Sequence, residues 1–592
     1  MHKNIENLLQ KKHIVYSAIA LLALIVYSNS FFAPFTLDDF SSISNNYDIR
    51  NPLDPLAIWK FYSNRFLLYY SLSINYFIHD TSVVGYHITN VALHIFNGIL
   101  VYLILINILS LKPFSSKVPG KYPRILALLS SMIFVCHPIQ VNAVTYIVQR
   151  TAALAAMFYF LAVLYFLKFR IQDKNRYFVL TFIFTIAAMF TKENTITIPF
   201  LLALLEFMFF LKDGKTSWPK RIAFLLVLFM TVPIIPGTNL ALKGYSQSDP
   251  GVSFKASTDM DRFHYFYTEL NVIIKYIRLT LFPIGLNFDY SNDFPISKTI
   301  WENRSYVSFV VLCFIGLIGL INIRKNKLIS LGIFWFFIGL AVESSFISIK
   351  DVYFEHRLYF PLVGYVMVLL GLVFVEFRRK RRLYLFRKPI LYFLVISIIL
   401  IPFYSTLTLY RNYIFSDGIR LWADVVKKAP RSDRAHSVLA TNYLDAYELS
   451  NNKNPEYLKN SEEGFKKAIE LNYYNDTAHC NLSKVYYLKG EYEKCIEEAN
   501  ITIGMVESVY AYHNLGLAYK SLSKIDDALQ AYLSAYKLDN KCTFILKALG
   551  NTYYEIDDFK NARFYYQEFL KYNNYSDNDE IRKKLNNGDG SR

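Results

Sequence analysis

The sequence predicts an all-α protein in two parts, a polytopic helical membrane domain followed by an α-solenoid of short helical repeats. Up to about Asn412 the chain is a series of long apolar runs divided by short loops. From about Asp417 onward it is polar, charged and rich in Tyr, and it has no run of the roughly 20 apolar residues that a span needs. This polar part also repeats itself with a period of about 34 residues.

About eleven apolar segments qualify as spans. They are 13–33, 86–109, 125–136, 151–167, 177–191, 195–211, 221–236, 305–322, 328–349, 358–377 and 389–410. The segment 266–285 is ambiguous because Glu269, Asn271, Lys275 and Arg278 interrupt it. The first segment follows a basic start, and no small-x-small cleavage site follows it convincingly, so we interpret it as an uncleaved span.

Charge bias orients these spans, because Lys and Arg in short loops mark the cytoplasmic side of a membrane. With a cytoplasmic N-terminus and a non-spanning 266–285, the basic loops 110–124, 168–176, 212–220, 323–327 and 378–388 all fall inside. The opposite choice would place the basic run Arg378–Arg382 outside. Loops 34–85, 137–150, 191–194, 237–304 and 350–357 then share the outer face with the repeats. The formal net charge of +17 therefore indicates a membrane protein rather than one that binds nucleic acid.

The repeats are visible as matched positions in the C-terminal part. Leu515, Gly516, Tyr519, Ala528 and Tyr532 recur 34 positions later as Leu549, Gly550, Tyr553, Ala562 and Tyr566. This is the period and pattern of the tetratricopeptide repeat, whose stacked helix pairs form a concave surface for a peptide or protein. The predicted domains are a membrane domain over 1–412, a connecting partial repeat over 413–434, repeats over 435–577 and a polar tail over 578–592.

Two acidic positions are the first candidates for chemistry. Asp38 and Asp39 open the outer loop that directly follows the first span. Two adjacent carboxylates at a membrane surface can supply a general base or hold a metal ion. The alternative is a solvated or helix-capping acid pair, because an adjacent pair is a weak motif by itself. Lys192 and Glu193, in the outer turn 191–194, could likewise form only a local ion pair.

Several basic side chains lie in the outer loops as well. Arg150 and Arg357 are cations on the outer side, against the charge bias. Guanidinium groups suit phosphate, although a residue flanking a span can simply extend its charged end to the surface. His356 precedes Arg357, and His137 opens an unusually polar loop where His137-Pro138 could only end a helix. A carboxylate pair with nearby cations suits transfer from a lipid phosphate donor. No P-loop, dinucleotide fingerprint or His-Glu-x-x-His site occurs in the sequence.

A set of motifs runs in order through the outer loops and the second span. They are Thr36-Leu37-Asp38-Asp39-Phe40; Gly85-Tyr86-His87 with Asn90, His94 and Asn97; His137-Pro138-Ile139-Gln140; Ala143-Val144-Thr145-Tyr146 with Gln149-Arg150; Lys192-Glu193-Asn194; and His356-Arg357-Leu358-Tyr359-Phe360-Pro361. Followed by the repeats, this set resembles the bacterial relatives of the transmembrane and tetratricopeptide-repeat O-mannosyltransferases, which have the GT-C glycosyltransferase fold. Two positions depart from the pattern: Asn142 stands where an acid is expected, and no Pro follows Arg65.

The resemblance implies an inverting glycosyltransferase at the outer face of a bacterial inner membrane. It would transfer a sugar from a polyprenyl phosphate to a hydroxyl group, on protein or on a glycan. Asp38 or Asp39 would be the catalytic base. The residues expected to bind the donor phosphate or the substrate are Arg357, His356, Arg150, Lys192, Glu193 and His137.

The resemblance also implies the partners. These are the bilayer, the lipid-linked sugar and a protein or peptide acceptor held by the repeats, which would raise its effective concentration. No protein ligand set for a metal is assigned, and a divalent cation is left open. Two other functions remain open at this point. One is an enzyme of the same fold that modifies lipid or envelope glycan, and the other is a non-catalytic scaffold that uses the repeats to assemble envelope complexes.

Overall fold

The structure is a computed structural model, and every regular element that it describes is a helix. The described residues are 10–115, 122–211, 217–241, 260–291, 293–349, 351–372, 374, 387–451, 454–572 and 579–587. The chain divides into two compact units, one of Met1–Tyr290 with Phe294–Leu421 and the other of Ser291–Asp293 with Trp422–Arg592. The boundary lies within the predicted connector 413–434.

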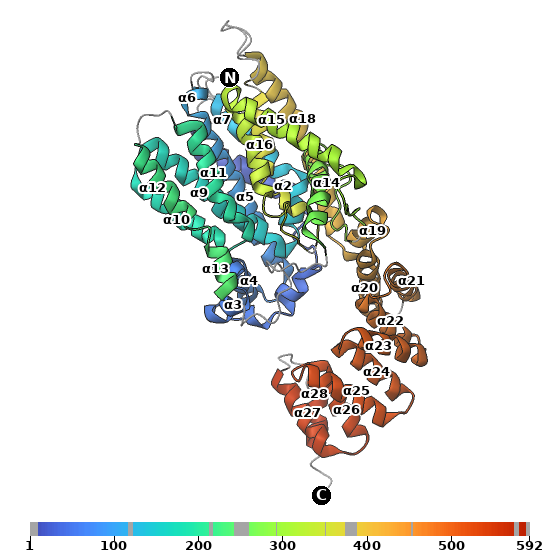
Figure 1. Ribbon diagram of the computed structural model, residues 1–592. Coiled ribbons are helices and arrows are strands. Elements are labelled where there is room, and N and C mark those ends of the chain that lie inside the picture. Colours follow the sequence, from blue (N-terminus) through green and yellow to red (C-terminus); the bar gives the residue numbers. More distant parts are fainter. Residues whose placement is uncertain are drawn as a thin grey trace. The chain divides into compact units, whose positions relative to one another are not determined.

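The first unit begins with α2 (Lys12–Val26) and closes with α18 (Arg387–Phe415) (Figure 1). Its other long helices are α4 (Phe66–His79), α5 (Val83–Leu109), α7 (Tyr122–Cys136), α9 (Arg150–Gln172), α10 (Asn175–Met189), α12 (Trp218–Phe229), α14 (Arg262–Leu281), α15 (Ser305–Lys325), α16 (Lys327–Leu340) and α17 (Leu362–Leu372). Among its shorter elements are α11 (Ile198–Leu205) and the short helices η3 (Ser63–Arg65), η5 (Ile147–Gln149), η6 (Glu193–Thr197) and η9 (Glu355–Leu358).

Each predicted span overlaps an apolar helix, although several of these helices are shorter than predicted. In the described part of the chain, six helical segments are long and apolar enough to cross a membrane, and α7 with the short helices after it forms a seventh that bends by 49°. Four more apolar helices, α2, α10, α16 and α17, are shorter. The first unit is therefore a multi-pass membrane domain. The basic run Arg378–Arg382, on which the predicted orientation rests, lies outside the described residues.

Burial separates central from peripheral spans. In α9, 72% of the most apolar window is buried inside the protein, against 6% in α15 and 22% in α18. α9 packs on α5 and α10, and α5 also packs on α7 (Figure 1). The apolar side chains of α15 and α18 are left exposed, as on a helix that faces lipid. α9 is thus the helix around which the first unit is organised.

A polar stripe on α5 joins this core together. His87, Asn90, His94 and Asn97 are spaced by three and four residues, so they lie on one face of the helix, and all four are fully buried. Their side chains reach the backbone carbonyls of Ala33, Val144, Ile147, Val135 and Ala153. Polar side chains between membrane helices act as such cross-links. The α5 stripe therefore fixes the segment after α2, the end of α7 and the beginning of α9.

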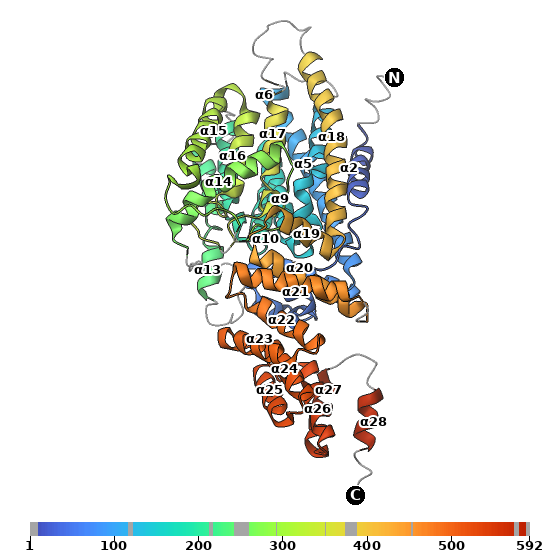
Figure 2. The ribbon, with the colours of Figure 1, turned by 90° about the vertical axis from the view of Figure 1, so that its right-hand side faces the viewer.

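The second unit is a stack of antiparallel helix pairs (Figure 2). α19 (Gly418–Lys428) crosses the boundary, and the pairs are α20 (Asp433–Leu449) with α21 (Pro455–Leu471), α22 (Asp476–Leu488) with α23 (Tyr492–Met505), α24 (Val509–Ser521) with α25 (Ile525–Leu538) and α26 (Thr543–Glu555) with α27 (Phe559–Tyr572). Ser432, Asn475 and Ser508 cap three of the first helices by accepting a backbone amide. These pairs confirm the predicted repeats.

The predicted polar tail differs from the structure in one respect. Residues Asp579–Asn587 form a further helix, α28, because Ile581 and Leu585 recur four positions apart and pack against the last repeat pair. Residues 588–592 lie outside the described part of the chain.

Gly516 on α24 permits the closest approach within a repeat. A Cβ at this position would overlap the ring of Tyr532 on α25, which is fully buried. Gly550 and Tyr566 repeat the arrangement in the next pair.

We predict that Gly516→Ala destabilises the α24–α25 pair by about 1–3 kcal/mol, because the added methyl overpacks a filled contact. Gly504→Ala on α23 is the control, since a Cβ there has no neighbour within 4 Å. It should stabilise its helix by about 0.5–1 kcal/mol through the lower conformational freedom of Ala. Hydrogen–deuterium exchange of the full chain measures both, and equal protection of α24 and α25 in the two variants would contradict the prediction.

Candidate functional site

Asp39 ties the first outer loop to the start of α9. Its carboxylate is fully buried, with Oδ1 accepting from the amide of Val148 at 2.7 Å and Oδ2 from the amide of Thr36 at 3.0 Å. Burial raises the pKa of the Asp39 carboxyl to about 8, although the two amide donors lower it. Asp38 differs from it in exposure: the residue is exposed, its backbone amide donates to the hydroxyl of Tyr146 at 3.0 Å, and its carboxylate also interacts with that hydroxyl.

Arg150 also holds the start of α9, two residues after Val148. It is the first residue of α9 and is fully buried. Its guanidinium donates to Asn90 Oδ1 at 2.6 Å, to Asn75 Oδ1 at 2.5 Å and to the carbonyls of Ser71 and Tyr86, both at 3.2 Å. These partners lie on α4 and α5. Since amide side chains and carbonyls fill its donors, Arg150 orients the beginning of α9 from within the protein.

The outer turn 191–194 adjoins this assembly through two contacts. The Thr151 hydroxyl of α9 donates to the carbonyl of Thr191 at 3.2 Å. The backbone amide of Leu67, on α4, donates to the carbonyl of Phe190 at 3.0 Å. The loop that carries Asp38 and the turn that carries Lys192 are therefore fastened to the same few residues at the start of α9.

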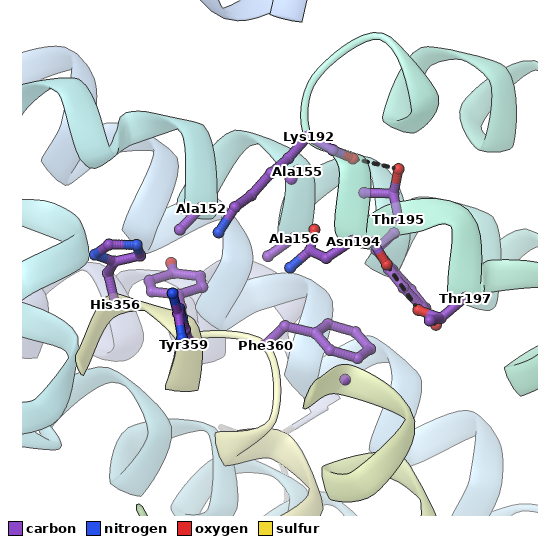
Figure 3. A pocket seen from close by; sticks show the side chains of 13 residues that line it. Ala152, Ala155, Ala156, Lys192, Asn194, Thr195, Thr197, His356, Tyr359 and Phe360 are labelled. Carbon is purple, nitrogen blue, oxygen red and sulfur yellow. Dashed lines mark hydrogen bonds between the residues drawn. The ribbon is translucent and has the colours of Figure 1, made fainter. Parts of the chain in front are cut away.

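A pocket lies on the other side of this helix end. Three alanines of α9 form one wall, at positions 152, 155 and 156. Lys192, Asn194, His356 and Arg357 supply the polar lining, and Figure 3 shows the Lys192 side chain extending over the pocket in the direction of His356.

Ion pairs between separate elements surround the pocket. Arg65 of η3 holds Glu193 in a two-pronged contact, with both N–O distances at 3.1 Å. Lys192 Nζ lies 2.7 Å from Glu343 Oε1. Arg357 Nη1 lies 3.7 Å from Glu269 Oε1.

Backbone carbonyls hold Arg357, and nearby cations keep Glu343 charged. Arg357 also donates to the carbonyls of Val352 and Asp351. Burial alone would raise the pKa of Glu343, but Lys192 and Arg357 lower it overall. Glu343 therefore stays a carboxylate beside the pocket.

Tyr69 on α4 relates the pocket to the Asp38 loop. Burial raises the pKa of its phenol, Arg65 lowers it, and the charges of Asp38 and Glu193 raise it further. The charges of Asp38 and of the Arg65–Glu193 pair thus all act on the Tyr69 phenol. We take the Asp38 loop and the pocket as the candidate site.

The structure brings together most, but not all, of the residues predicted from sequence. Lys192, His356 and Arg357 line the pocket, and Glu193 lies next to it. Asp38 and Asp39 lie on the adjoining loop. Arg150 is not part of the pocket lining. His137 is also outside it, buried with Nε2 3.1 Å from the carbonyl of Thr280.

Sequence reasoning missed two acids of the site. Glu269 on α14 pairs with Arg357, and Glu343, just after α16, pairs with Lys192. Glu343 was hidden because the predicted span 328–349 included it, whereas α16 ends at Leu340. Glu269 did give a signal, since a buried acid that interrupts an apolar segment calls for a partner. Within the described ranges, no group of three or more His, Cys, Asp or Glu side chains could hold a metal ion.

Comparison with known proteins agrees with this architecture. The family model for dolichyl-phosphate-mannose-protein mannosyltransferase matches residues 117–238, which include Arg150 and Lys192, and a tetratricopeptide-repeat model matches 509–542. The human protein O-mannosyl-transferase TMTC4 is 26% identical over 409 residues, covering 59% of this chain and 54% of the relative. The chain is a relative of the TMTC-type O-mannosyltransferases.

Other relatives extend the match along the chain. Human protein O-mannosyl-transferase TMTC3 is 21% identical over 559 residues, covering 86% of this chain and 54% of that protein. The chain thus spans about half the length of these TMTC relatives. Among solved structures, MamA from Desulfovibrio magneticus RS-1 matches 27% of this chain and 85% of its own, at 16% identity and a TM-score of 0.23.

We predict that Arg150→Lys destabilises the membrane domain by about 2–4 kcal/mol, because an ammonium cannot reach all the acceptors and leaves some of them buried without a donor. Arg176→Lys is the control, since Arg176 is exposed on α10. Thermal unfolding of the full chain in detergent measures the difference. A melting temperature lowered no more by Arg150→Lys than by the control would contradict a structural role for this guanidinium.

Proposed function

We propose that the chain is a membrane glycosyltransferase that transfers a sugar from a lipid-linked phosphate donor to a hydroxyl group of a protein. The observation that supports it most strongly is that the loop with the exposed Asp38 and the turn with the pocket-lining Lys192 are both held by residues at the start of α9. The names of the relatives specify protein O-mannosyl transfer. Mannose from a polyprenyl phosphate is accordingly the donor that we propose.

Asp38 is the proposed base. Burial favours the protonated form of Asp39, whose oxygens also face two backbone amides. A general base must instead be unprotonated and accessible to the substrate hydroxyl. Of the two acids, Asp38 meets the requirement of access, and Asp39 holds the loop in position.

The reaction is a single displacement at the sugar. Asp38 accepts the proton of the acceptor hydroxyl while that oxygen forms a bond to the anomeric carbon. The bond between this carbon and the phosphate oxygen breaks, and the lipid phosphate leaves with inverted configuration at the sugar. Lys192 and Arg357 stabilise the charge on the departing phosphate. Apolar walls beside them exclude water, which strengthens this stabilisation.

The remaining parts of the chain have proposed roles of their own. The repeats hold the acceptor protein and raise its effective concentration near Asp38. The site faces the outer side of a bacterial inner membrane, with the N-terminus in the cytoplasm, as the charge bias of the loops supports. The donor itself is held in the bilayer by its polyprenyl chain.

We predict that Asp38→Asn lowers sugar transfer by about 10²–10⁴-fold, as expected for loss of a general base. Asp48→Asn, on an exposed position of the same outer loop, is the matched control and should retain activity. Mass spectrometry of glycoproteins from a deletion strain that expresses each variant measures the transfer.

Three outcomes would contradict the proposal in different ways. Full glycosylation by Asp38→Asn would remove the proposed base. A deletion that alters lipids or envelope glycans but not glycoproteins would identify the other enzyme class. A deletion phenotype that Asp38→Asn rescues completely, with no glycan changed, would point to a scaffold.

A further inference from the structure

Each cation around the pocket has a carboxyl partner before any ligand binds. Three cations, Arg65, Lys192 and Arg357, are each paired with one carboxylate, Glu193, Glu343 and Glu269 respectively. In all three pairs at least one partner is buried to more than nine-tenths. A phosphate anion that enters adds negative charge without a matching positive one, and an unmatched charge in a buried site costs several kcal/mol.

Two pocket-lining nitrogens of the described ranges are buried without a hydrogen bond, Lys192 Nζ and His356 Nδ1, and Lys192 Nζ lies 2.7 Å from the Glu343 carboxylate. His356 is 7% exposed. Phe354 stacks on the ring at a centroid distance of 5.1 Å and fixes its plane. Burial lowers the pKa of His356 first, and then the charges of Lys192, Arg357 and Arg65 lower it further. The imidazole is therefore neutral while the pocket holds no anion.

A bound phosphate would favour the protonated form of His356 and would give its Nδ1 a partner. Its negative charge offsets the repulsion that the three cations exert on an imidazolium, and its oxygens can accept a hydrogen bond from the unpartnered nitrogen. Protonated imidazole donates from both nitrogens, whereas the neutral ring donates from one. One proton on His356 then adds a positive charge that matches the phosphate, and it also adds a hydrogen-bond donor for a phosphate oxygen.

Resting on the proposed function, we propose that the pocket takes up a proton on His356 when it binds a phosphate ester, so that the imidazolium becomes a fourth cation beside the ligand. The site thereby matches the charge of a lipid phosphodiester without carrying a permanent excess charge into an apolar pocket. His356 is in this account a specificity-determining residue for the phosphate group.

The other charged groups near His356 are already cationic or paired. Lys192 at the N-cap of η6, Arg65 of η3 and Arg357 of η9 are already cationic. Glu343, from the segment after α16, lies against Lys192. From α9 the pocket wall presents alanines and Tyr159, whose hydroxyl is bonded to Thr197.

Glu269 is the alternative site for the proton. Burial raises its pKa to about 7, although Arg357 lowers it, and Tyr265, Ser344 and Glu343 also act on it. Its carboxylate is not part of the pocket lining. A proton there would neutralise the partner of Arg357 but would add no bond to the ligand.

The test uses farnesyl methyl phosphate, a phosphodiester whose single negative charge does not change near neutral pH. Calorimetric titration of the full chain in detergent, in two buffers of different ionisation enthalpy, counts the protons taken up on binding. We expect uptake approaching one proton with the natural chain. Binding should weaken as the pH rises from about 6 to about 8, by at most about tenfold per pH unit.

Variants assign the proton to a residue. His356→Gln should bind with no proton uptake and with an affinity that does not depend on pH. Glu269→Gln should retain the uptake, and so should His13→Gln, which removes an exposed histidine at the start of α2. Uptake lost in Glu269→Gln but kept in His356→Gln would overturn the inference.

The natural chain alone also decides the matter if His356→Gln fails to fold. Binding without proton uptake would overturn the inference and leave the proposed function intact. Failure of the natural chain to bind the probe at any pH would overturn the proposed function and this inference with it.

Discussion

One buried carboxylate, that of Asp39, positions the candidate site. By accepting the amides of Thr36 and Val148 it joins the loop after the first span to the residues that begin α9. Arg150, two positions after Val148, fastens the same point to α4 and α5. Because these elements are far apart in sequence, the contact decides where the neighbouring Asp38 faces. Loss of the contact would free the loop even if every span kept its place.

The pocket shows how charge is tolerated beside a membrane. Its ion pairs come from η3, η6, η9, α14 and the end of α16, so each pair also links two elements. A buried pair of this kind gives little net stability, because desolvation offsets the attraction. The ion pairs instead fix positions: they keep Lys192 and Arg357 charged and in place until a ligand binds.

Much of this could be predicted from the sequence, for reasons that are physical. Apolar run length predicted the helices, and the recurrence of Gly516 with Tyr532 at Gly550 with Tyr566 predicted the repeat packing. The site was harder. Asp38 and Asp39 are adjacent and chemically alike, and only the fold shows that one is buried and the other exposed. Arg150 and His137 were predicted to bind the donor because they are polar residues at span ends. Their partners are carbonyls and amides of distant segments, which no local sequence pattern reveals.

The most direct measurement is an experimental structure of the full chain with a non-transferable mannosyl polyprenyl phosphonate bound. The account predicts the phosphonate oxygens within hydrogen-bonding distance of Lys192 and His356, and the anomeric carbon facing Asp38. A phosphonate bound away from the α9 end, or Asp38 turned away from the sugar, would contradict it.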